Sequence, residues 1–459
     1  MLIVWSNLCR RRIGLIAILL ILAFGIATVY WLGNNLWLNN SARNRAYVLV
    51  GGQRGGWFEA VQTPELYRVA LRDLSTESLT PVSSQGTVWT GSWNGSQWLI
   101  SGWGTDSGPQ GSNPYLYLYD GENQVVGSSL NQYENEATWR GGDIFGVSYN
   151  GSDWLLSGLG SGSLKSWSPQ SNHMGLALFD GRTFTDLSSQ IPDQWDAPLF
   201  ANDWNGHYWL VGGGWEGNEG ELYRYDGANL TDLSQQLESV LPFHSVQTIH
   251  WNGNYWLIGG MGFLIRYDGQ RFTDLTPQLD AAIGSQHKLS YSLCCNSVNA
   301  LAWNGTSWTI GGGSPVAVTQ PLTAWSVNFD GTNFTDLTAS LPPSVARPSH
   351  SSSILSIAWV DGSWFFGGYA DDNGTFFSIA NSTTTDLSNL VNSDFTVVNW
   401  VGGLPQTPMI NAKSFHEVGG LLFASDTKAR GQNSIRRDYR SDSRFIEEHS
   451  ANATTVLQI

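Results

Sequence analysis

The residues of this chain that could do chemistry are acids and aromatics in long segments rich in Gly, Ser and Pro. Carboxylates beside exposed aromatic rings could grip a cationic group, and the rings alone could stack on sugars. A pair of such carboxylates could also supply the acid and base of a glycosidase. Equally, the tryptophans could cover strand edges while the acids solvate loop tips. The candidate ligand-binding residues are Trp103, Asp106, Trp167, His173, Trp215, Glu216, Glu219, Asp371 and Asp372.

Motifs for other chemistries are missing from the sequence. It contains no Gly-x-Ser-x-Gly elbow, phosphate-binding loop or His-Glu-x-x-His helix. His287, Tyr291 and Cys294 lie close together, as copper ligands would, but they match no copper motif. We therefore expect no metal site and no cofactor. Calcium in the acidic loops stays open as an alternative, although no spacing matches a known calcium loop.

The candidate segments connect the parts of a repeat. Its first phrase reads Trp-Asn-Gly and then a Trp that begins an apolar run ending in Gly-Gly, as in 251–260. Its second phrase reads Tyr-Asp-Gly and, two residues later, Phe-Thr-Asp-Leu, as in 267–275. The first phrase recurs every 47 to 57 residues, which is typical of propellers rather than solenoids.

Each repeat predicts four short strands. Asn-Gly and Asp-Gly between aromatic or β-branched runs favour tight hairpins, because both residues accept the positive φ of a primed turn. A four-stranded sheet cannot bury both of its faces alone, so the repeats must pack around an axis. The predicted fold class is all-β, a β-propeller of four-stranded blades. Seven blades are expected, with six or eight as alternatives, because second strands begin near Tyr47, Gln97, Asp153, Tyr208, Tyr255, Ser307 and Ser363.

The first repeat lacks its own first strand, since the segment before Tyr47 is a separate apolar stretch. We expect a late segment to supply it and close the ring, either 395–400 or 412–417. The tight turns should lie on one face of the propeller and the long connections on the other, where recognition usually occurs. One tryptophan per repeat should pack between blades, namely Trp98, Trp154, Trp209, Trp256, Trp308 and Trp364.

The order of apolar strand, Gly-Gly, Tyr-Asp, aromatic and Leu in 257–275 resembles the kelch repeat of propellers similar to the central domain of galactose oxidase. The resemblance extends from about residue 47 to residue 417. Kelch repeats usually have Trp where this chain has Phe184, Phe272 and Phe334, and two repeats here read Ser-Gly instead of Gly-Gly. The chain thus resembles a divergent member. The resemblance implies a propeller and leaves its activity open.

The N-terminal region predicts a membrane anchor. Residues 13–32 are uncharged and mainly apolar, long enough to cross a bilayer, and they follow Arg10, Arg11 and Arg12. We expect residues 1–12 in the cytoplasm, a signal-anchor helix at 13–32, and the rest outside the cytoplasm, as in a single-pass membrane protein. Cleavage of a signal peptide near Gly25-Ile26-Ala27 is the alternative.

The remaining chain divides into a linker at 33–45, the propeller at 46–425 and a flexible polar tail at 426–459. Residues 46–425 hold 12 basic and 33 acidic side chains, a formal net charge of −21. Such a charge repels nucleic acid, which we therefore exclude as a partner. The sequence favours a membrane-anchored extracytoplasmic module that binds or scaffolds a protein or carbohydrate ligand through its long loops. A carbohydrate-active enzyme with acids in these loops, or a structural envelope component, are the alternatives.

Overall fold

The computed structural model describes residues 46–55, 62–79, 85–104, 113–121, 124–125, 143–159, 174–191, 197–214, 220–242, 245–284, 289, 297–315, 322–346, 351–371, 373–391 and 395–404. Among these residues no helix is long and apolar enough to cross a membrane. The predicted anchor at 13–32, the linker and the tail lie outside the described residues. So does 412–417, the second candidate for the closing strand.

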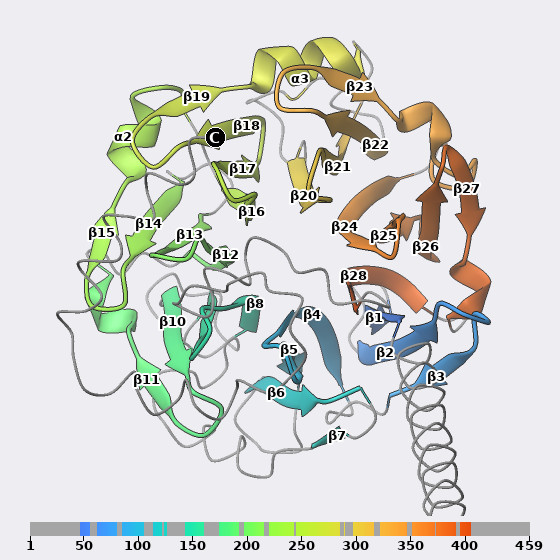
Figure 1. The fold of residues 1–459 in the computed structure, drawn as a ribbon, viewed down its shortest axis with the longest axis horizontal. Helices are drawn as coiled ribbons and strands as arrows, with labels where there is room; N and C mark the ends of the chain where they lie inside the picture. Colours follow the sequence, from blue (N-terminus) through green and yellow to red (C-terminus); the bar gives the residue numbers. More distant parts are fainter. Residues whose placement is uncertain are drawn as a thin grey trace, which may run out of the picture. The chain divides into compact units, whose positions relative to one another are not determined.

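The described strands form seven antiparallel sheets of four strands, and these sheets are arranged in a ring around a common axis (Figure 1). The all-β class and the seven-bladed propeller are therefore confirmed. We number the blades 1 to 7 in the order in which their second strands follow along the chain.

The first strand of every blade lies nearest the centre of the ring (Figure 1). From blade 1 to blade 7 these inner strands are β28 (Phe395–Leu404), β4 (Gly86–Trp93), β8 (Asp143–Tyr149), β12 (Leu199–Trp204), β16 (Val246–Trp251), β20 (Ser297–Trp303) and β24 (Ser352–Val360). The second strands are β1 (Tyr47–Arg54), β5 (Trp98–Gly104), β9 (Trp154–Leu159), β13 (Trp209–Gly213), β17 (Trp256–Gly260), β21 (Trp308–Pro315) and β25 (Ser363–Ala370).

The third strands are β2 (Thr63–Ala70), β6 (Asn113–Tyr119), β10 (Met174–Phe179), β14 (Glu221–Tyr225), β18 (Phe263–Tyr267), β22 (Leu322–Phe329) and β26 (Asn373–Ala380). The short outer strands are β3 (Thr76–Ser78), β7 (Gln124–Val125), β11 (Phe184–Asp186), β15 (Leu230–Asp232), β19 (Phe272–Asp274), β23 (Phe334–Asp336) and β27 (Thr383–Asp386). Single helical turns or short helices follow five of them, namely η2 (Ser188–Gln190), α2 (Ser234–Glu238), α3 (Thr276–Ile283), η3 (Thr338–Ser340) and η4 (Ser388–Leu390).

Blade 1 joins the two ends of the propeller. Its inner strand β28 pairs antiparallel with β1, from Tyr47 opposite Leu404 to Arg54 opposite Phe395. The first of the two predicted closing segments is thus correct, and the strand extends four residues beyond Trp400. Thr396 adds a side-chain bond, because its hydroxyl donates to the carbonyl of Gly55 at 2.7 Å.

The Asp361-Gly362 turn has the predicted geometry, with positive φ angles of 50° and 83°, whereas the other described Asn-Gly and Asp-Gly turns depart from it. In the turn after β4 only Gly95 has a positive φ, of 99°, whereas Asn94 does not. The Asn94 side-chain oxygen instead accepts the N–H groups of Ser96 and Gln97, at 2.9 and 2.8 Å. The Asn therefore serves as a hydrogen-bond acceptor that fixes the turn, and the Gly occupies the one left-handed position, as in a type II′ turn.

The Gly-Gly pairs allow blades to approach each other closely. A Cβ atom on Gly212 would lie 2.6 Å from Cγ1 of Val246, which belongs to the next blade. A Cβ atom on Gly213 would lie 2.0 Å from the carbonyl oxygen of Pro198, which directly precedes the neighbouring strand β12. The motif therefore marks the place where the second strand meets both its own blade and the next one.

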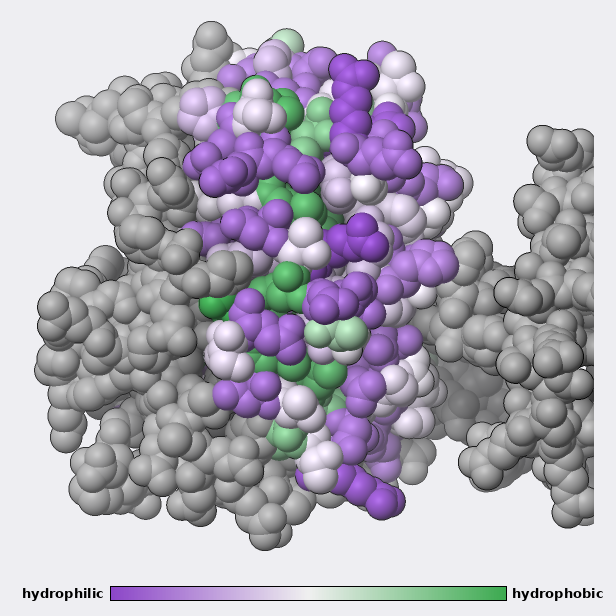
Figure 2. Space-filling model, turned by 90° about the vertical axis from the view of Figure 1, so that its left-hand side faces the viewer, coloured by the Kyte–Doolittle hydropathy of each residue, from purple (hydrophilic) through white to green (hydrophobic). Residues whose placement is uncertain are grey.

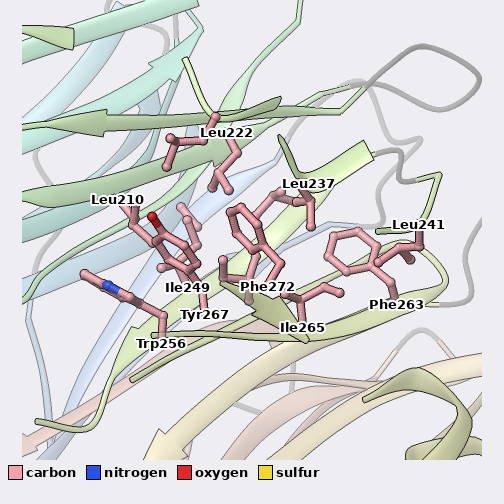
Figure 3. Close-up of a cluster of buried hydrophobic side chains, with 14 of the residues drawn as sticks. Leu210, Leu222, Leu237, Leu241, Ile249, Trp256, Phe263, Ile265, Tyr267 and Phe272 are labelled. Atoms are coloured by element: carbon pink, nitrogen blue, oxygen red, sulfur yellow. The ribbon is translucent and has the colours of Figure 1, made fainter. Parts of the chain in front are cut away.

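Hydrophobic side chains fill the spaces between blades. Figure 3 shows one such cluster, in which Leu210, Leu222 and Leu237 of blade 4 pack against Trp256 and Phe272 of blade 5. The six recurring tryptophans are buried as predicted, each at most 8% exposed. Trp98 and Trp308 also donate their indole N–H groups to tyrosine hydroxyls of the preceding blade, Tyr47 and Tyr255, each at 3.0 Å.

The rim of the ring is mainly polar. Figure 2 shows one side of it, where hydrophilic side chains surround small, separate hydrophobic spots. Among the described residues Leu74 and Val240 are the only exposed large hydrophobic side chains. The rim seen in this view thus offers no broad apolar surface among its described residues.

Candidate ligand-binding site

The two faces of the propeller differ as the sequence predicts. The Asn-Gly and Asp-Gly turns lie on one face, which we call the hairpin face, and the connections between second and third strands lie on the opposite loop face. On the loop face these connections vary in length, from Met261-Gly262 in blade 5 to residues 160–173 in blade 3. The inner strands also begin at the loop face, because each follows the outer strand of the preceding blade.

Two of the nine predicted site residues are described. Trp103 lies on β5, opposite Thr87 of β4 and Pro114 of β6, and it is partly buried. Asp371 follows β25 in blade 7 with a φ of 54°. Blade 1 lies between these two blades, so the structure does not bring this pair together. The other seven lie outside the described residues, namely Asp106, Trp167, His173, Trp215, Glu216, Glu219 and Asp372.

Asp371 has a structural role. Its N–H group donates to the carbonyl of Ser351 at 2.6 Å, and its carboxylate accepts the N–H group of Ser351 at 3.2 Å. These bonds hold the residue that precedes β24 beside the end of β25. The carboxylate is thus engaged in the turn of its own blade.

A different set of residues gathers around the axis. Every inner strand contains a β-bulge near its beginning, where one extra residue is inserted into the pairing with the second strand. The inserted residues, from blade 1 to blade 7, are Asn399, Trp89, Phe145, Phe200, Gln247, Asn299 and Leu355. All except Asn399 are partly exposed, so this ring of side chains combines aromatic and amide groups near the axis.

Three consecutive bulges carry aromatic rings. The ring centroids of Trp89 and Phe145 lie 5.3 Å apart, and those of Phe145 and Phe200 lie 5.1 Å apart. The planes are tilted by 54° and 58°, an arrangement that aromatic pairs favour. Because the rings contact each other across blade boundaries, they form a continuous aromatic arc over blades 2, 3 and 4.

Amide groups occupy other bulges and donate to hydroxyls at the blade boundaries. The Asn299 amide donates to the Ser353 hydroxyl of the next blade at 2.9 Å, and the Asn399 amide donates to the Thr87 hydroxyl at 2.8 Å. The Asn399 amide nitrogen also donates to the carbonyl oxygen of Val88 at 3.3 Å, and this oxygen can only accept. The amide orientation is thereby fixed, and its oxygen Oδ1 is buried without a hydrogen-bond partner.

Asp143 lies beside the aromatic arc, two residues before Phe145 on β8. The bulge between Ile144 and Gly146 interrupts the alternation of side chains here, so Asp143 is placed by its position on the inner strand, two residues before Phe145. Its Oδ1 atom is completely buried and accepts no hydrogen bond. Loss of solvent raises the pKa of this carboxyl to about 7. Asp143 therefore exchanges its proton near neutral pH.

The named carboxyls near the axis do not form a facing pair. Asp143 begins β8 at the loop face, whereas Asp203 lies near the end of β12, toward the hairpin face. Asp203 accepts from His250 Nδ1 at 3.0 Å and from the backbone N–H of Trp251 at 2.8 Å. This pairing links two inner strands. Within the described part of the chain, no group of three or more His, Cys, Asp or Glu residues could hold a metal ion.

We define the axial site as Asp143, Trp89, Phe145, Phe200 and Asn399. Sequence reasoning missed all five, and it missed the four bulge residues because strict alternation along a strand hides a bulge. A signal was nevertheless present. When the repeats are aligned on Asn-Gly, the sixth residue before the Asn is always Val, Ile or Leu, whereas the fifth is variable: Trp89, Phe145, Phe200, Gln247 and Asn299.

Known proteins resemble this chain in fold alone. No family model and no curated protein matches it. Among solved structures, the acylaminoacyl peptidase of Pyrococcus horikoshii is 10% identical over 74% of this chain and 52% of its own, with a TM-score of 0.40. This chain thus spans about half the length of that peptidase.

Two further structures are similar to the same degree. The β-propeller domain of the Trilobed protease from Pyrococcus furiosus is 9% identical, over 75% of this chain and 96% of its own, with a TM-score of 0.39. TolB from Acinetobacter baumannii is 11% identical over 78% of this chain and 67% of its own, with a TM-score of 0.36. Likeness at this level carries no argument about activity, and the propeller assignment rests on the sheet order of the chain itself.

Proposed function

We propose that this chain is a membrane-anchored, extracytoplasmic propeller of a divergent kelch-like type that binds a protein or carbohydrate ligand at the axial site. The observation that carries the proposal is the Asp143 carboxyl, whose Oδ1 atom is buried without a partner on the inner strand that also carries Phe145, the middle one of three partly exposed aromatic rings. An unsatisfied buried acceptor costs folding free energy. Packing alone gives no reason to keep a carboxyl at this position. A ligand that donates a hydrogen bond to the carboxyl gives such a reason.

The path of the chain supports this assignment. Tyr47 pairs with Leu404 at the hairpin face, so a segment that precedes residue 46 joins the propeller there. The linker at 33–45 spans at most about 45 Å when fully extended. An anchor at 13–32 would thus hold the hairpin face toward the membrane and leave the loop face with the axial site directed outward.

Binding fits the described residues better than glycoside hydrolysis does. Hydrolysis needs two carboxyls that face each other across the substrate. Asp143 and Asp203 begin and end their respective strands at opposite faces, and Asp203 is engaged with His250. Aromatic side chains beside a single acid are suited to holding a ligand.

A binding screen tests the proposed function. The full chain in detergent micelles is applied to glycan and peptide arrays, with and without calcium. We expect hits that the double variant Phe145→Ala/Phe200→Ala weakens about tenfold or more, since each ring removed takes contact area and stacking energy with it.

The matched control is Val240→Ala, which shortens an exposed apolar side chain far from the axis. It should keep every hit, and circular dichroism should show that both proteins are folded. Hits that the double variant binds as well as the unaltered chain would place ligand binding elsewhere on the molecule.

A further inference from the structure

The axial site offers hydrogen-bond acceptors that lack donors. Asp143 Oδ1 and Asn399 Oδ1 are both buried without a partner. β28 and β8, which carry them, are the inner strands on either side of β4, which carries Trp89. A ligand that satisfies either atom must bring an N–H or O–H donor. A hydroxyl group both donates and accepts hydrogen bonds, whereas guanidinium and ammonium groups only donate. A site that offers acceptors therefore matches guanidinium and ammonium groups better.

The aromatic arc has the same preference. Trp and Phe rings attract cations to their faces, and a planar guanidinium can stack on a ring while its edge donates to a carboxylate. Phe145 follows Asp143 by two residues on β8, and the Asn399 amide donates to the carbonyl of Val88, the residue before Trp89. The formal charge of −21 over residues 46–425 adds a long-range field that draws cations toward the molecule.

We propose that the axial site binds an organic cation, the guanidinium or ammonium group of a peptide side chain, with the Asp143 carboxylate as its counter-charge. This inference rests on the proposed binding function and specifies the chemistry of the ligand. The cation supplies the donor that the Asp143 carboxyl lacks, and the aromatic arc contacts its apolar stem.

The titratable surroundings of Asp143 are simple. The strands that pack against β8 carry Asp203 on β12 and the tyrosines of β6. Burial raises the pKa of Tyr117 far above neutrality, so this tyrosine is uncharged. On β8 itself Tyr149 is the other titratable residue. His250, which contacts Asp203 at 3.0 Å, lies one strand further from β8, on β16. Among the described residues of β8 and of the strands that pack against it, Asp143 is the group whose pKa is raised to about 7, so we expect its charge to change between pH 6 and pH 8.

Calorimetric titration of the full chain in micelles tests the proposal. The probes are arginine and lysine with blocked termini, citrulline with blocked termini as the neutral isostere of arginine, and methyl glucoside. We expect blocked arginine or lysine to bind at least tenfold more tightly than citrulline. Affinity for the cation should rise about tenfold from pH 6 to pH 8, because the ionised fraction of a group with a pKa near 7 changes by that factor.

Asp143→Asn should abolish both the preference for cations and the pH dependence. The matched control is Asp268→Asn, which removes one carboxylate from a turn of the type that Asn forms elsewhere in this chain. It should leave binding unchanged. Should Asp143→Asn fail to fold, the comparison of pH 6 with pH 8 in the unaltered chain tests the same charge.

Equal binding of arginine and citrulline, or no binding of either cation, overturns the proposal. So does a cation affinity that Asp143→Asn retains. If array hits depend on Phe145 and Phe200 while both cations fail to bind, the ligand class is wrong and the binding function stands. If methyl glucoside alone binds, the ligand is a carbohydrate. If the array gives no hits and the cations do not bind, both proposals fail.

Discussion

At the level of single residues, this chain uses Asp in two opposite electrostatic settings. In the Asp-Gly turns the carboxylate accepts backbone N–H groups, as Asp268 does from Gln270 and Arg271 at 2.8 and 2.7 Å. These bonds lower the pKa of Asp268. Asp143 has no such donors, and burial raises the pKa of its carboxyl to about 7. The first kind of Asp stabilises a turn, and the second is available to a ligand.

The raised pKa of Asp143 predicts a specific dependence of stability on pH. Between about pH 4 and pH 7 the native state holds a proton that the unfolded state has released, so the free energy of unfolding falls as pH rises through this window. Asp143→Asn cannot ionise and should remove this decline. At pH 8 we expect it to be more stable than the unaltered chain by about 1–3 kcal/mol.

Urea unfolding at pH 4, 5, 6, 7 and 8 measures this difference for both proteins. The gap between them should open with rising pH and stop widening above pH 8. A constant gap across the series would mean that Asp143 titrates near its ordinary value.

The sequence distinguishes these settings only in part. The Asp-Gly positions are recognisable because in four repeats two residues separate them from an apolar residue followed by Thr-Asp-Leu. Asp143 occurs once, and its burial depends on strands contributed by other blades. Asp371, one of the predicted site residues, illustrates the same limit, since its bonds to Ser351 arise from a fold that brings residues 20 positions apart together.

At the level of elements, a hydroxyl that follows the outer strand ties two strands together in five of the seven blades. After the Asp-Leu of β19, Thr276 Oγ1 accepts the backbone N–H of Leu264 in β18 at 3.0 Å, and Thr276 itself is buried. In four other blades a backbone N–H group of the third strand donates to a hydroxyl in the same way, and these hydroxyls belong to Ser188, Ser234, Thr338 and Ser388. The hydroxyl thus continues the sheet pairing where the outer strand ends.

Substitutions at Thr276 separate this hydrogen bond from packing. Thr276→Val keeps the shape but leaves the Leu264 N–H without an acceptor, and should lower the free energy of unfolding by about 1–3 kcal/mol. Thr276→Ser, the residue that three other blades use, should cost much less. Urea unfolding measures both. An equal loss in the two variants would show that the threonine methyl group matters rather than the bond.

Element-scale periodicity also explains what sequence analysis missed. The alternation of apolar residues predicts the strands, but a bulge shifts the alternation by one residue, as between Ile144 and Gly146. From the sequence alone, Phe145 is therefore assigned to the regular alternation of the strand. The side chains that line the axis are the ones displaced in this way, so the regular pattern predicts the blades and conceals the site.

At the level of the whole molecule, closure depends on a strand from the far end of the propeller. Val398 of β28 lies against Gly367 of blade 7, and Trp400 packs edge-on against Trp98 of blade 2 at 5.5 Å. β28 therefore contacts both neighbours of blade 1 in addition to β1.

At this scale much could be predicted from the sequence. Counting the repeats predicts the number of blades, and the missing first strand of the first repeat limits the closing strand to two candidate segments. The long loops were beyond prediction, because they share no repeated pattern.

Truncation tests the importance of this closure. A chain that ends at Leu404 keeps β28 and should unfold at the same temperature as the full chain. A chain that ends at Asp394 lacks β28 and exposes apolar surface on β1, including Val48 and Val50. We expect its melting temperature to fall by about 10 °C or more. Differential scanning calorimetry measures both, and equal melting of the two chains would show that blade 1 is stable without its inner strand.

The long separation within blade 1 has a consequence for biosynthesis. Thr396 and Gln53, which bond across the closure, are 343 positions apart. At ribosomal speeds of roughly 5–20 residues per second, the three strands β1, β2 and β3 wait about 20–70 s for their partner to be translated. During that interval the edge of β1 offers unpaired backbone groups to other nascent chains. Chaperones that shield strand edges should therefore matter most before Leu404 leaves the ribosome.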